Sequence, residues 1–112
     1  MLKVVNGKKV GFLGINKIYI GRKSYVSKGS VLNNKFRIGQ DENRNEVVEK
    51  YRKWLWEEYK KKGEVYQELV RIKNKVMKGE EIELVCWCSP QKCHGDVVKN
   101  CVEWMIESQK DS

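Results

Sequence analysis

A chain of 112 residues with 40% hydrophobic content has the size of one domain with a single modest core. Its formal net charge of +8 is typical of proteins with a polyanionic partner or an anionic substrate. The composition excludes a membrane protein, because no stretch approaches the roughly 20 apolar residues of a membrane span. The N-terminal residues lack the apolar segment of a signal peptide, so we expect an intracellular, cytoplasmic protein.

The positive charge does not by itself identify nucleic acid as the partner. Lysine supplies 18 of the 23 basic residues, and these lysines are spread along the chain. Such a distribution is equally typical of solvated helix faces. Nucleic acid and a nucleotide-like anion are therefore candidate partners, and the charge alone does not choose between them.

The first third of the chain predicts strands and a long loop. Residues 2–5 and 10–13 flank Asn6-Gly7, the favoured pair for a tight turn, and this pattern predicts an N-terminal hairpin. A further strand is expected over residues 16–22, with Ile18 and Ile20 on one face. Residues 21–40 contain several glycines and predict a structured loop, of a length that is often functional.

Helical periodicity dominates the rest of the chain. An apolar stripe predicts a helix that begins near residue 43 or 45 and ends at Gly63; its members are Val47, Val48, Tyr51, Leu55 and Tyr59. A second stripe predicts a helix up to Gly79; its members are Val65, Leu69, Ile72 and Val76. Residues 82–87 predict a buried strand, and residues 95–108 a last helix.

This order of elements predicts one α/β domain over residues 1–112. We expect a small sheet that is at least partly parallel, with an N-terminal hairpin and three helices packed on it. Two helices separate the strand that contains Ile18 and Ile20 from the strand over residues 82–87. Because a connection of that length permits parallel pairing, we expect these two strands to be parallel.

The most informative segment lies between the last predicted strand and the last predicted helix. Residues 86–96 read CWCSPQKCHGD and contain three of the four cysteines, the single proline and the single histidine. In open α/β folds, ligands bind outside the carboxyl ends of the strands and beside helix N-termini. The sequence therefore predicts a site at this strand-to-helix turn.

Two sequence blocks together resemble a known family. The first comprises YIGR at residues 19–22 and NNKFRIGQD at residues 33–41; the second is CWCSPQKCHGDV at residues 86–97. They are similar, over about residues 18–100, to the domain-of-unknown-function family numbered 4326, found in bacteria, phages and other mobile elements. The resemblance implies no established activity. The family usually has Asn-Pro-Phe at residues 34–36 and Gly-Arg-Asp at residues 39–41, where this chain has NKF and GQD. If the family's arginine binds an anion, Arg37 or Arg44 must do so here.

One interpretation of the cysteine-rich turn is an enzyme site. His94 is the natural acid/base candidate, because its ordinary pKa lies near neutrality. Cys93 would be a nucleophile activated by the helix N-terminus, and Asp96 would cap the helix or orient His94. The substrate would be nucleotide-like or a nucleic acid. The ligand-binding candidates, expected to line one cleft with His94, are Arg22, Asn34, Arg37, Asp41 and Arg44.

Two other interpretations of the turn remain open. Three thiols and an imidazole suit tetrahedral zinc, although the C-x-C-x₄-C-H spacing departs from the usual pairs; the candidate ligands are Cys86, Cys88, Cys93 and His94. Alternatively the cysteines only pack, with Cys101 in the core and His94 hydrogen-bonded to a backbone carbonyl. The protein would then be a non-catalytic binding module, with nucleic acid as one candidate target.

The tryptophans predict one further surface. Trp54 and Trp56 lie about 200° apart on a helix, so they cannot both face the core. We expect one of them to line a pocket or a partner surface. Packing is the expected role of the other tryptophans, although an exposed ring beside basic residues could stack on a base.

Overall fold

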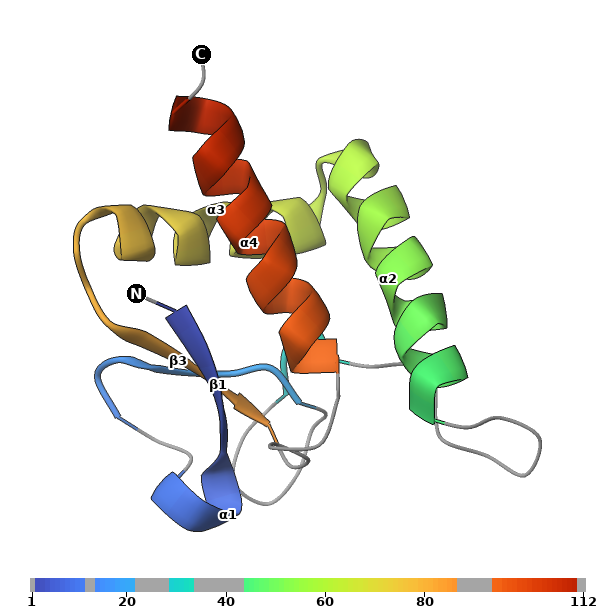
Figure 1. The fold of residues 1–112 in the computed structure, drawn as a ribbon. Coiled ribbons are helices and arrows are strands. Elements are labelled where there is room, and N and C mark those ends of the chain that lie inside the picture. Colours follow the sequence, from blue (N-terminus) through green and yellow to red (C-terminus); the bar gives the residue numbers. More distant parts are fainter. Residues whose placement is uncertain (1, 12–13, 22–28, 34–43, 87–93, 111–112) are drawn as a thin grey trace.

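The structure is a computed structural model that describes residues 2–11, 14–21, 29–33, 44–86 and 94–110. Three strands, β1 (Leu2–Asn6), β2 (Lys17–Tyr19) and β3 (Ile82–Cys86), form a sheet in the order β1-β3-β2. The helices are α1 (Gly7–Val10), α2 (Arg44–Lys61), α3 (Glu64–Met77) and α4 (His94–Lys110). Figure 1 shows their arrangement.

The central strand β3 explains why the sheet forms. Its residues Ile82, Leu84 and Cys86 belong to the hydrophobic core, while Val85 on the opposite face is also fully buried. A strand buried on both faces is typical of parallel sheets, whose strands are nearly continuously apolar. Both neighbours pair with β3 in parallel, Leu2 opposite Ile82 and Ile18 opposite Leu84. The predicted parallel relation of the strand containing Ile18 to the last strand is confirmed.

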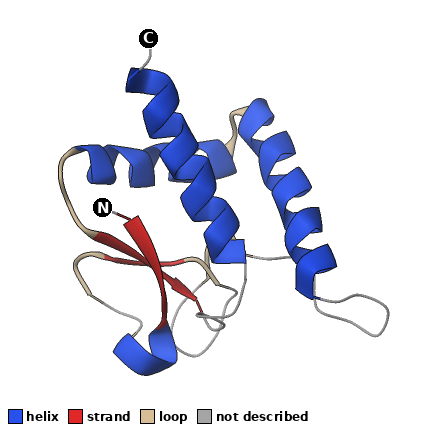
Figure 2. Ribbon diagram, viewed as in Figure 1, coloured by secondary structure: helices blue, strands red, loops and turns tan. Residues whose placement is uncertain are grey.

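Three helices pack together with the sheet, as the sequence predicts. Helices α3 and α4 contact β3, α4 also contacts β1, and α2 packs against both α3 and α4. Figure 2 shows these helices grouped together, with α2 farthest from the strands. The predicted apolar stripes supply the core; its fully buried helical members include Val48, Tyr51, Leu55, Leu69, Ile72, Val98 and Val102. None of the helices in the described part is long and apolar enough to cross a membrane.

The prediction of an N-terminal hairpin is wrong. Residues Leu2–Asn6 pair in parallel with β3, and Asn6 begins a short helical turn, α1, instead of a reverse turn. The Asn6 side chain accepts a hydrogen bond from the Lys8 backbone N–H at 2.9 Å, the usual interaction of a helix N-cap. Gly11, at φ 91°, ends the turn. The Asn6-Gly7 pair therefore begins a helical turn. The strand before it pairs with β3, which buries Leu2.

Candidate functional site

The carboxyl ends of the three parallel strands lie at one edge of the sheet, which we call the carboxyl edge. Asn6 and Cys86 are paired there at the ends of β1 and β3. Beyond the end of β2, the Ile20 N–H donates to the Val85 carbonyl at 3.1 Å and continues the pairing. Helix α4 begins at this edge with His94. The end of β3 and the start of α4, which flank the predicted site, therefore lie at the edge where parallel α/β sheets bind ligands.

His94 links the start of α4 to the end of β2. Its Nε2 lies 2.8 Å from the Ile20 carbonyl oxygen, and the residue is only 7% exposed. A carbonyl oxygen only accepts hydrogen bonds, so Nε2 carries the proton and donates it. The Tyr51 ring packs edge-on against the imidazole, with centroids 5.1 Å apart and planes at 70°. These two contacts fix the position of the imidazole.

Tyr51 ties the segment at residues 29–33 to the same edge. Its hydroxyl donates to the Leu32 carbonyl at 2.6 Å, and both residues are fully buried. The Ser30 N–H donates to the Gly21 carbonyl at 2.9 Å, and the Ser30 Oγ accepts from the Leu32 N–H at 3.0 Å. Four segments that are distant in sequence therefore meet around His94: the end of β2, residues 29–33, α2 and α4.

Gly21 lies in close approach to the Tyr19 ring at the end of β2. A Cβ atom on Gly21 would lie 2.5 Å from the Tyr19 hydroxyl oxygen and 2.6 Å from the adjoining ring carbon. Any larger residue would therefore force the Tyr19 ring to move. Gly21 is followed directly by the candidate Arg22, whose own position lies outside the described residues.

Both described cysteines are buried thiols. The Cys86 Sγ lies 3.4 Å from the Val5 carbonyl, to which the thiol donates. Burial raises the pKa of the Cys101 thiol to about 11, so this cysteine carries little thiolate at neutral pH and is a poor nucleophile. The expectation that Cys101 belongs to the core is confirmed.

The zinc interpretation depends partly on residues that the structure does not describe. Cys88 and Cys93 are among them, and within the described ranges no group of three or more metal-binding side chains comes together. Zinc takes a thiolate sulfur or an unprotonated ring nitrogen as a ligand. In the observed arrangement, the Cys86 thiol donates a hydrogen bond to the Val5 carbonyl. The His94 Nε2–H donates to the Ile20 carbonyl, so that only Nδ1 of this ring could ligate zinc.

The structure describes only some of the other predicted site residues. Asp96 lies in the first turn of α4 and is partly buried, two residues after His94. Arg44 is the first residue of α2, but its side chain is not described. The remaining candidates lie outside the described residues; they are Arg22, Asn34, Arg37, Asp41 and Cys93. The predicted single cleft therefore stays a prediction.

Tyr51 is the residue at this edge that sequence reasoning missed. It was assigned to the core because it belongs to an apolar helical stripe, and it is indeed fully buried. The available signal was its hydroxyl, because a buried tyrosine normally needs a hydrogen-bond partner. The sequence could not identify that partner, a backbone carbonyl 19 residues away.

The tryptophans of α2 face different surroundings, as their spacing predicts. Trp54 packs against the hydrophobic core, whereas Trp56 lies edge-to-face with Trp104 of α4, with ring centroids 5.0 Å apart. Trp56 and Trp104 line a small cavity of about 210 Å³ between the two helices, with Cys101 among the other lining residues. Trp104 is 45% exposed.

The structure is that of a small parallel α/β domain in which His94, at the start of α4, contacts the end of β2 at the carboxyl edge. The chain belongs to the DUF4326 family of domains of unknown function, whose family model matches residues 6–104. No curated protein and no solved structure gave a match. The family membership therefore agrees with the resemblance seen in the sequence motifs and brings no activity with it.

Proposed function

We propose that this domain binds a nucleotide-like anion at the carboxyl edge of its sheet. The observation that supports the proposal is the junction at His94, where α4 begins beside the end of β2 and is held there by a 2.8 Å hydrogen bond. Ligands of parallel α/β folds bind outside the carboxyl ends of the strands. The N-terminus of α4 would offer backbone N–H groups and the positive end of a helix dipole to an anion.

Arginines within or just after the first family block would supply the counter-charge. Arg22 follows Gly21 directly in sequence, and the neighbouring Ile20 carbonyl is the partner of His94. Arg37 and Arg44 flank the segment in which the family usually has an additional arginine. An arginine guanidinium binds phosphate or carboxylate through two parallel hydrogen bonds, so any of these residues suits a phosphate group.

The observed contacts give His94 a role in holding two elements together. Its Nε2–H donates to a backbone carbonyl, and the Tyr51 ring packs edge-on against the imidazole. With Nε2 held in this way, any acid/base role would fall to the other ring nitrogen, Nδ1. We therefore assign His94 a positioning role, which is to hold the start of α4 against the end of β2.

Arg22→Ala is expected to weaken nucleotide binding at least about tenfold. Losing one charge-assisted contact to a phosphate costs roughly 2–5 kcal/mol, and a tenfold change corresponds to about 1.4 kcal/mol. Thermal-shift screening would identify the nucleotide, and calorimetric titration would measure its Kd. Lys60→Ala is the control, because the Lys60 side chain is 70% exposed on α2 and pairs with Glu57. Equal affinity of the two variants would contradict the assignment of Arg22.

A nucleic-acid target is the second candidate, favoured by the net charge of +8. In that case oligonucleotides would stabilise the domain and mononucleotides would not. The logarithm of the binding constant would also fall linearly with the logarithm of the salt concentration, since each phosphate contact releases counterions. The same screen, repeated with single-stranded and double-stranded oligonucleotides, distinguishes the two targets.

A further inference from the structure

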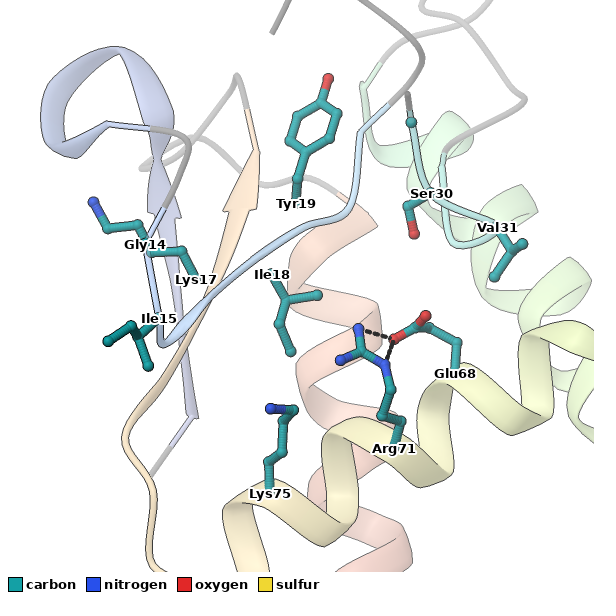
Figure 3. A pocket seen from close by; sticks show the side chains of 11 residues that line it. Gly14, Ile15, Lys17, Ile18, Tyr19, Ser30, Val31, Glu68, Arg71 and Lys75 are labelled. Carbon is teal, nitrogen blue, oxygen red and sulfur yellow. Dashed lines mark hydrogen bonds and ion pairs between the residues drawn. The ribbon is translucent and has the colours of Figure 1, made fainter. Parts of the chain in front are cut away.

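A second cavity lies along the outer side of β2, between that strand, residues 29–31 and α3 (Figure 3). Its volume is about 440 Å³, within the roughly 300–1,000 Å³ of small-molecule sites. Its lining residues are Gly14, Ile15, Lys17, Ile18, Tyr19, Gly29, Ser30, Val31, Glu68, Arg71 and Lys75. Of the family motif at residues 86–97, the residues that the structure describes, 86 and 94–97, do not contribute to it.

The lining of this cavity carries an excess of positive charge. Among the described residues, it holds three basic side chains and one carboxylate, that of Glu68. Glu68 Oε1 accepts from Arg71 Nε at 2.7 Å and also contacts Nη2, so the third guanidinium nitrogen, Nη1, can donate to a ligand. Lys75 forms no ion pair with any residue that the structure describes. An anion would therefore meet a net positive cavity.

Two of the cations come from α3, whereas the apolar residues beside them come from β2 and residues 29–31. Figure 3 shows Arg71 and Lys75 reaching from α3 towards Ile18, which is buried in β2. Lys17 lies at the other end of the cavity, and its ammonium donates to the Gly11 carbonyl at 3.3 Å. Ile18 and the partly buried Val31 form apolar walls beside the two α3 cations.

We infer that this cavity binds a small organic anion of at least two negative charges, with its charged end on Arg71 and Lys75. The apolar body of the ligand would lie against Ile18 and Val31. Phosphate and carboxylate groups share the required chemistry, because both accept hydrogen bonds from guanidinium and ammonium groups. This site is separate from the proposed nucleotide site at the start of α4.

The test uses phenyl phosphate and phthalate as probes, two dianions that each carry an apolar ring, titrated into the full chain at low salt. Binding is measured by calorimetry and located by backbone amide NMR. We expect the largest shifts at Ile18, Ser30 and Val31. The double variant Arg71→Gln/Lys75→Gln should weaken binding at least tenfold. Lys53→Gln/Lys78→Gln removes the same charge from exposed positions outside the cavity and should change the affinity less than twofold.

Binding of either probe with this pattern supports the inference, and the better probe identifies the preferred group. Equal losses in the two double variants would overturn it, since the binding would then reflect overall charge. Absence of binding by both probes would also overturn it. Shifts confined to the first turn of α4 would overturn this inference and leave the nucleotide proposal intact, so the two can fail separately.

Discussion

His94→Ala is expected to lower the free energy of unfolding by about 2–4 kcal/mol. The substitution removes a buried ring that packs on Tyr51, and buried aromatic-to-alanine changes cost about 3–5 kcal/mol. It also leaves the Ile20 carbonyl without the donor that now lies 2.8 Å away, which costs about 1–3 kcal/mol when the group stays dry. The estimate is below the sum of these terms because imidazole is smaller than a phenyl ring and water can reach the edge.

Urea denaturation of the wild type and the variant measures this loss. His94→Gln is the informative companion, since its side-chain amide keeps an N–H donor for the Ile20 carbonyl. We expect it to recover part of the lost stability. A His94→Ala variant within about 0.5 kcal/mol of the wild type, the range of ordinary surface substitutions, would show that the His94 junction contributes nothing.

Tyr51→Phe is expected to destabilise the protein by about 1–3 kcal/mol, although it keeps the ring and its contact with His94. The hydroxyl is buried and donates to the Leu32 carbonyl at 2.6 Å. Phenylalanine leaves that carbonyl without its donor, and a buried unsatisfied polar group costs about this much. The change therefore isolates one hydrogen bond between α2 and residues 29–33.

Tyr66→Phe is the matched control for this measurement. Tyr66 lies on α3, is only partly buried and packs edge-to-face on Tyr59. Its substitution should change the stability by less than about 0.5 kcal/mol. If the two tyrosine variants lose the same free energy of unfolding, the loss is a general effect of removing a hydroxyl. The Tyr51–Leu32 hydrogen bond would then not anchor residues 29–33.

Much of the fold follows from the hydrophobic pattern. The stripes on α2 and α3 predict helices that end near Gly63 and Gly79, and the observed helices end at Lys61 and Met77. The long connection through two helices correctly predicts parallel pairing of β2 and β3. These features are local, or depend only on the length of a connection, so one sequence suffices to predict them.

The N-terminal region shows where local patterns fail. Asn6-Gly7 is compatible with a hairpin turn and with a helix N-cap, because both use the short side chain of asparagine. Pairing of β1 with β3, about 80 residues away in sequence, selects the second alternative. Contacts of that separation leave no periodic signal in the chain.

Only part of the candidate site could be predicted from the sequence, because its contacts also join residues that are distant along the chain. The position of His94 at a strand-to-helix turn follows from the sequence around it, and the structure confirms that α4 begins there. Its partner, the Ile20 carbonyl, lies 74 residues earlier and offers a backbone atom that any residue would supply. Tyr51 belongs to an apolar helical stripe, and that stripe does not indicate the partner of its hydroxyl. The sequence therefore predicts the local position of His94, and the structure identifies the carbonyl that it contacts.

The most direct test of the account is an amide NMR titration with the nucleotide selected by thermal shift. Binding at the carboxyl edge predicts the largest shifts at Ile20, Gly21 and the first turn of α4, residues 94–97. Saturable shifts there, lost in Arg22→Ala, are the expected result. Saturable binding whose shifts leave these residues unchanged, and fall instead on the cavity beside β2 or between α2 and α4, would contradict the account.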